Sequence, residues 1–159
     1  MELLSGSTVK VEILELKPKP VNDSYSALGL YMLRQLETVG GAPVDSDDTD
    51  IAQSYLLAHY LVVPEEGVSG YLVAPLPGGM RAKGVWKRSG DELTPLHWTL
   101  GEGIVQAILP DLTEGEHQIV VLVDAHIGGD YFWPGSKIVG IDEEVLSSTI
   151  SERVKIEWE

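Results

Sequence analysis

The stretch LPDLTEGEHQIVVLVDAHIGG, Leu109 to Gly129, contains the longest apolar run of the chain, bounded by turn-forming residues on both sides. Pro110 and Gly115 precede the run, and a Gly-Gly pair ends the stretch. Because successive side chains of a strand point to opposite faces, Ile119–Val123 places apolar groups on both faces. A strand with one face in water alternates apolar and polar residues instead. The stretch therefore predicts a central β-strand that is covered on both sides.

The same stretch contains a corner motif, an alternating strand and a glycine turn in succession. A Leu-x-x-Gly-x-His corner spans Leu112 to His117, alternating Ile119, Val121 and Val123 come next, and then Asp124 and Gly128-Gly129. In this order they resemble a late strand of bacterial and phage immunoglobulin-like, fibronectin-III-like domains. His117 stands where such domains carry the tyrosine of the tyrosine corner, and there is no cysteine pair. The resemblance implies an antiparallel β-sandwich and assigns no functional residue.

Composition sets bounds on the class of protein. The chain has 159 residues, 43% of them hydrophobic, which predicts one folded domain over residues 1–159 with a sizeable core. No run approaches the roughly 18 apolar residues of a membrane span. The N-terminal sequence lacks a basic region followed by an apolar one, so no signal peptide is expected.

Charge and cysteine content narrow the range of partners. With 25 acidic and 11 basic residues the net charge is −14, which disfavours nucleic acid and anionic membranes as partners. The chain has no cysteine, which rules out disulfides, thiolate zinc sites and cysteine nucleophiles.

Two segments before residue 67 show apolar residues at helical spacing. In residues 24–39 these include Met32 and Leu36, although Gly29 disfavours a helix interior and keeps a strand as the alternative. Residues 48–62 fit either a helix that begins after a run of aspartates or a fully buried strand. We predict one or two inserted helices near residues 24–39 and 48–62, placed over the second face of the central strand.

After residue 67 the pattern changes to short apolar segments separated by turns. Strands are predicted, besides the central one, over residues 69–74, 82–88, 93–100, 104–109, 137–141 and 153–158. The expected fold is mainly β, an antiparallel sandwich of immunoglobulin-like character.

Three consecutive aromatic residues, Tyr131, Phe132 and Trp133, follow the glycine turn. Because neighbouring residues of an extended chain point to opposite sides, the three rings cannot all enter one core. Aromatic side chains are common at the centres of protein interfaces. We therefore predict that this segment contacts a protein partner.

Four cations, Arg81, Lys83, Lys87 and Arg88, lie close together in the sequence. They could form a patch that docks an acidic partner, and we include them in the predicted interface. A solvated hairpin face is the alternative.

Motifs for metal binding and catalysis are missing. The aspartate cluster between Asp45 and Asp50 could hold Ca²⁺, but the twelfth position of an EF-hand would be Leu56 instead of glutamate. We predict no metal and no cofactor, with calcium left open at this cluster. No nucleophile or phosphate-binding motif is present, which favours a non-enzyme. The enzymatic alternative is a small hydrolase that uses His126 with Asp130, or His97.

These features predict a non-enzymatic structural or assembly module that binds proteins and associates with itself as a symmetric homo-oligomer. The expected location is the virion, after assembly in the cytoplasm. Phage capsid decoration and tail proteins resemble the chain in folding in a reducing cytoplasm and leaving the cell on the particle. A cytoplasmic protein-binding adaptor is the alternative.

Overall fold

The computed structural model describes residues 4–5, 8–9, 25–26 and 29–157, and these residues form strands and turns without a helix. The predicted central strand is β12 (Gly115–Ala125), which pairs with β6 (Ser54–Val63) and β8 (Met80–Ser89). Strands β4 (Tyr31–Thr38) and β9 (Glu92–Pro95) complete an antiparallel sheet in the order β4-β6-β12-β8-β9. No described segment is a helix of the length and apolarity that crossing a membrane requires.

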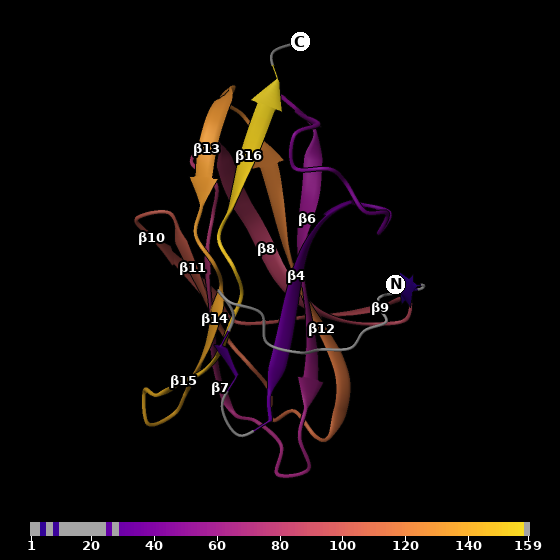
Figure 1. Ribbon diagram of the computed structural model, residues 1–159, viewed down its shortest axis with the longest axis vertical. Coiled ribbons are helices and arrows are strands. Elements are labelled where there is room, and N and C mark those ends of the chain that lie inside the picture. The colour runs from indigo at the N-terminus through magenta and orange to yellow at the C-terminus, as the bar shows by residue number, and fades with distance from the viewer. Residues whose placement is uncertain (1–3, 6–7, 10–24, 27–28, 158–159) are drawn as a thin grey trace.

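The remaining strands belong to three other sheets (Figure 1). The largest has the order β10-β11-β7-β14-β15-β3: Trp98–Gly101, Ile104–Ile108, Gly70–Pro75, Lys137–Gly140, Val145–Ser148 and Tyr25–Ser26. A three-stranded sheet has the order β13-β16-β5: Gly129–Trp133, Glu152–Glu157 and Thr49–Asp50. Strands β1 (Leu4–Ser5) and β2 (Thr8–Val9) pair with each other.

The core lies between the five-stranded sheet and the six- and three-stranded sheets. Leu57 and Val121 come from the five-stranded sheet, Leu72 from the six-stranded sheet and Ile156 from the three-stranded sheet, and all of them belong to one buried cluster. The architecture is therefore a mainly antiparallel β-sandwich, as the sequence predicted.

The expected helices near residues 24–39 and 48–62 were wrong. Within the first segment the structure shows β3 and β4, and within the second β5 and most of β6. Gly29 has a φ of 82°, which marks a turn rather than a helix interior. In β6, Leu57 is buried on the inner face and Ala58 on the outer face, so the apolar run is that of a strand covered on both sides.

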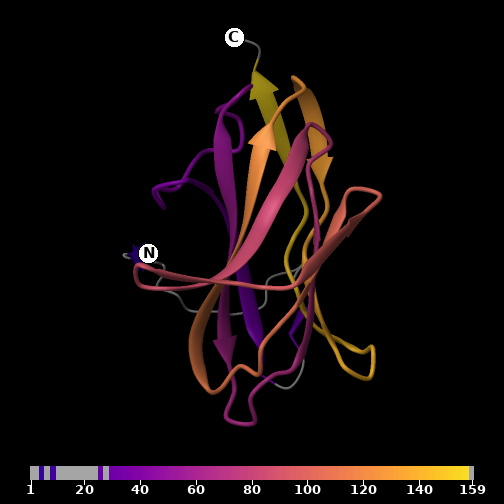
Figure 2. The ribbon, with the colours of Figure 1, turned by 180° about the vertical axis from the view of Figure 1, so that it is seen from behind.

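The predicted strand over residues 93–100 is divided into β9 and β10, which belong to different sheets. Strands β8 and β9 form a hairpin, with Ser89 paired to Glu92. From there the chain crosses to the other layer, and Figure 2 shows the β8–β9 hairpin reaching sideways from the sheet.

Side chains of its own strands close the outer face of the five-stranded sheet. Val120 is buried there in a small cluster with Leu56 and Ala58. The ring of Trp86 lies over Gly84, where an added Cβ would come within 2.4 Å of the ring. This apolar cover takes the place of the helices that the sequence predicted.

Candidate functional site

The three consecutive aromatic residues occupy β13 and alternate between its two faces. Tyr131 packs against the core, and its hydroxyl donates to the carbonyl oxygen of Ile127 at 3.0 Å. Phe132 is 61% exposed, whereas Trp133 is fully buried. The alternation expected from an extended chain is therefore present, and it leaves Phe132 as the ring that faces solvent.

Trp133 is an anchor in the core and not a surface contact, which corrects its placement in the predicted interface. Its indole N–H donates to the carbonyl oxygen of Pro75 at 3.0 Å. The guanidinium of Arg34 stacks on its ring, with Cζ 3.6 Å from the ring centroid. Both contacts fix the orientation of β13 and thereby hold the neighbouring Phe132 outward.

Arg34 reaches from β4 across the sandwich to a break between strands. Strand β13 is separated from β14 by Pro134–Ser136, and β15 is separated from β16 by Thr149–Ser151. Backbone carbonyls at this break accept from the guanidinium: Pro134 at 2.6 Å, Ile150 at 3.3 Å and Trp133 at 3.4 Å. The buried cation thus supplies the donors that an uninterrupted strand pair would have supplied.

His59 and Ser136 extend this network. His59 Nδ1 lies 3.2 Å from the carbonyl oxygen of Ile119, which can only accept, so Nδ1 carries the proton. The unprotonated Nε2 then accepts from the Ser136 hydroxyl at 2.8 Å, and that oxygen accepts from Arg34 at 3.2 Å. Both His59 and Ser136 are fully buried, so this serine–histidine pair joins the two layers inside the core.

Burial is the main cause of the pKa shifts of the ionisable groups in this network. It lowers the pKa of His59 to about 3, with the charge of Arg34 acting in the same direction. It also lowers the pKa of Arg34 to about 10, and Glu152 opposes this shift. Burial raises the pKa of Glu152, although Arg34 lies 3.8 Å away. Loss of hydration therefore outweighs the attraction within this ion pair.

The outer face of β13 and β16 carries charges of both signs around Phe132. Phe132 lies opposite Arg153, and Asp130 lies opposite Lys155. Ion pairs join Arg153 to Asp130 at 3.5 Å and Lys155 to Glu157 at 3.9 Å, with all four side chains largely solvent-accessible. We call these five residues the Phe132 surface: an exposed aromatic ring within a mixed-charge ladder.

The four cations of β8 do not form one patch. Arg88 is largely buried and pairs with Glu37 at 3.1 Å, beside the Tyr60 hydroxyl that also donates to Glu37. Lys87 lies on the opposite face of the strand from Arg88, since the side chains of neighbouring strand residues point to opposite faces. Lys83 lies at a β-bulge, where its side chain pairs with Asp124 at 3.3 Å, and Arg81 lies beyond the bulge. Strand geometry therefore separates residues that are close in sequence.

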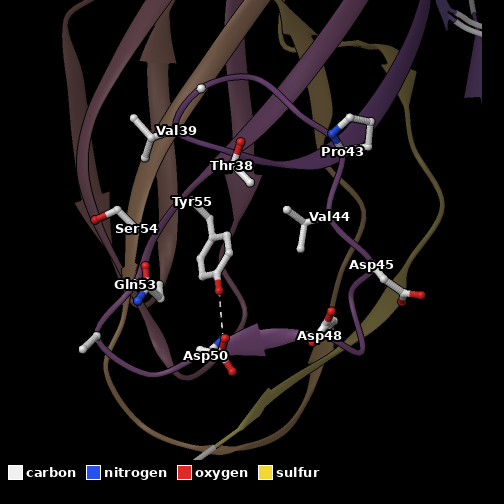
Figure 3. Close-up of a pocket in the computed structure, with 12 residues that line it drawn as sticks. Thr38, Val39, Pro43, Val44, Asp45, Asp48, Asp50, Gln53, Ser54 and Tyr55 are labelled. Atoms are coloured by element: carbon white, nitrogen blue, oxygen red, sulfur yellow. Dashed lines mark hydrogen bonds between the residues drawn. The ribbon is translucent and has the colours of Figure 1, made fainter. Parts of the chain in front are cut away.

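The aspartate cluster lies along an open groove of about 730 Å³ at one end of the sandwich (Figure 3). Asp45, Asp48 and Asp50 line it together with Val44 and Tyr55, and the Asp50 N–H donates to the Tyr55 hydroxyl oxygen at 2.8 Å. Burial raises the pKa of Tyr55. Among the described residues, no three acidic or imidazole side chains are grouped as ligands for a metal ion.

The histidines named for a hydrolase are not joined to a carboxylate within the part of the chain that the structure describes. The Nδ1 atom of His126 is buried, and no described group hydrogen bonds to it. His97 is exposed.

Comparison with protein-family models finds no match, and neither does comparison with curated protein sequences. Solved structures do match. The fold is an immunoglobulin-like β-sandwich. Salmonella α2-macroglobulin reacted with methylamine superimposes with a TM-score of 0.68 at 16% identity, over 94% of this chain and 10% of that one. An Escherichia coli α2-macroglobulin fragment from domain MG7 to the C-terminus gives 0.67 at 13% identity, over 89% of this chain and 25% of that one.

A smaller protein has a more distant likeness. The non-cellulosomal cohesin of the archaeon Archaeoglobus fulgidus gives a TM-score of 0.51 at 10% identity, over 79% of this chain and 91% of that one. By contrast, the chain spans about a tenth of the length of the Salmonella macroglobulin chains. At these identities the likeness establishes the immunoglobulin-like fold and leaves function to the residues themselves.

Sequence reasoning missed the network beneath the Phe132 surface. Arg34, His59 and Ser136 are far apart in the sequence and match no motif. One signal was present: Arg34 is a lone cation two residues before the buried Leu36, on the face of β4 that enters the core. A charged residue at such a position needs partners from elsewhere in the fold.

Proposed function

We propose that this immunoglobulin-like domain is a non-enzymatic assembly module that associates with itself through the Phe132 surface. The observation that carries the proposal is the 61% exposure of Phe132, whose strand is anchored by a fully buried Trp133. A large apolar ring held rigidly in water is typical of an interface centre, because little conformational entropy is lost when it is covered.

The mixed charges around Phe132 favour a second copy as the partner. Two proteins of net charge −14 repel each other across most of their surfaces. On the Phe132 surface, however, Arg153 and Lys155 accompany Asp130 and Glu157. A two-fold axis through this ladder would bring cations of one copy to carboxylates of the other, which makes the surface self-complementary.

The setting that we propose is a virion, with the protein as a capsid decoration or tail component assembled in the cytoplasm. Support comes from the immunoglobulin-like fold, the absence of cysteine and the sequence resemblance to phage domains of this class. A cytoplasmic adaptor is the alternative setting, and the groups around His126 and His97 give no specific support to a hydrolase. The genes on either side separate these settings: capsid, portal or tail genes would support the virion, and a metabolic operon would oppose it.

Replacing Phe132 by serine is expected to weaken self-association by about fivefold to 150-fold, because covering such a ring contributes roughly 1–3 kcal/mol. Sedimentation velocity over a range of protein concentrations measures the effect. Leu93→Ser is the matched control, since Leu93 is similarly exposed on β9, away from the Phe132 surface. A wild-type protein that stays monomeric at every concentration would contradict self-association, and so would an equal effect of the two substitutions.

A further inference from the structure

The outer face of the six-stranded sheet carries a row of apolar side chains across four strands. Ile108 on β11 pairs with Tyr71 on β7, Tyr71 with Val139 on β14, and Val139 with Val145 on β15. Ile108 is 52% exposed, Tyr71 39% and Val145 37%. Cross-strand neighbours lie about 5 Å apart, so the four side chains form one continuous strip.

More apolar groups extend the strip along the same face. Val73 is two residues beyond Tyr71 on β7 and therefore lies on the same side, and Ile104 pairs with Pro75 one further step along. Val73 has polar neighbours on both sides, because it pairs with the exposed Gln106 on β11 and with Lys137 on β14. We call the row and these neighbours the β7 face.

The two outer faces of the sandwich differ in how far their apolar side chains are covered. On the five-stranded sheet, Trp86 covers Gly84, and the buried Glu37 pairs with Arg88 above the apolar cluster. On the β7 face, Tyr71 and Ile108 keep a third or more of their surface in water. A continuous exposed apolar face of this kind marks a contact site in a soluble protein.

Acidic turns border the β7 face at both ends. Glu102 lies in the turn between β10 and β11, beyond Ile104, and is exposed. At the opposite end the exposed turn between β14 and β15 contains Ile141 followed by Asp142, Glu143 and Glu144. An occupant must therefore offer apolar side chains in its centre and cations at its margins.

We infer that the β7 face docks a protein partner whose apolar surface is flanked by lysine or arginine side chains. The contact would be sheet-like, because a flat strand face packs well against another extended segment or sheet. A second copy of this chain fits poorly here, since its own acidic turns would meet those of the first. The inference concerns a surface other than the Phe132 surface and does not depend on self-association.

A peptide with alternating leucine and serine in its centre and two lysines at each end is a defined probe, because as a strand it presents an apolar face between two cationic ends. Fluorescence anisotropy of the labelled peptide measures its affinity for the protein in a Phe132→Ser background. We expect binding that weakens by about tenfold or more in the Tyr71→Ser, Ile108→Ser double variant. The single variant Ile108→Lys, which places a cation on the strip, is expected to weaken binding as well.

Two matched peptides test whether the partner needs both apolar side chains and cations. One matched variant tests whether binding is specific to the β7 face. Peptides in which serine replaces the leucines, or glutamate replaces the lysines, are expected to bind at least about tenfold more weakly. The Leu93→Ser, Ile127→Ser variant removes two other exposed apolar side chains and is expected to leave affinity unchanged. Equal binding of either matched peptide, or equal loss in the control variant, would overturn the inference. A change from dimer to monomer caused by Tyr71→Ser and Ile108→Ser would assign the face to a second copy and also overturn it.

Discussion

Replacing Arg34 by methionine is expected to lower the free energy of unfolding by roughly 3–5 kcal/mol, or to prevent folding at ordinary temperature. The substitution keeps most of the apolar length of the side chain. It removes the donors to the carbonyls of Trp133, Pro134 and Ile150, and the Trp133 carbonyl loses a buried hydrogen bond. It also removes the cation that faces Glu152 and the ring of Trp133.

Urea unfolding followed by tryptophan fluorescence and by circular dichroism measures this effect. Arg81→Met is the matched control, because Arg81 is an exposed cation on β8 and surface charges contribute less than about 1 kcal/mol. A loss of less than about 1 kcal/mol for Arg34→Met would contradict the role that we assign to the network. The intermediate variant Arg34→Lys keeps the charge and loses the planar fork, so its stability is expected to fall between the two.

Acid destabilisation is the second large effect, and His59 is its expected source. Its pKa in the folded protein is about 3, well below the ordinary value of 6.5. A group with a lowered folded pKa stabilises the fold above its unfolded pKa, and this stability is lost as the pH falls toward the folded pKa. His59 alone should therefore reduce the free energy of unfolding by up to about 1.4 kcal/mol for each pH unit below about 6.5.

The variant His59→Gln tests this by the slope of the unfolding free energy against pH between about 6.5 and 5, where most carboxylates stay charged. Glu152 has a raised pKa and acts in the opposite direction, but it is present in both proteins and cancels in the comparison. His97→Gln provides a control on an exposed imidazole. Parallel slopes for wild type and His59→Gln would show that the buried ring does not control acid stability.

The sequence predicted the sandwich because the local sequence pattern of β12 matches the place of this strand in the fold. Its apolar run, flanking turns and central position all follow from residues within one short stretch. The two segments taken as helices failed for a specific reason. A strand covered on both faces has no polar alternation, so β6 has no periodicity that separates it from a buried helix.

The candidate site was predicted only in part. Alternation along an extended chain identified an exposed ring among three aromatics, but it could not say which one, and the fold assigns that place to Phe132. The β7 face was not visible at all, because Tyr71, Ile108 and Val145 become neighbours only when four strands pair. Pairing between distant strands is a property of topology that no single stretch of sequence contains.

The contact that Arg34 makes across the sandwich also bears on the order in which the molecule is built. Its hydrogen-bond partners lie between 99 and 116 residues further along the chain. During synthesis the cation leaves the ribosome long before those carbonyls exist, and loop closure over such a separation is slow. The hydrogen bonds that Arg34 makes from β4 can therefore form only after the segments from β13 to β16 have been synthesised. Docking of Arg34 against the other layer is thus expected late in folding. It requires the segments on both sides of the β14–β15 hairpin to be in place.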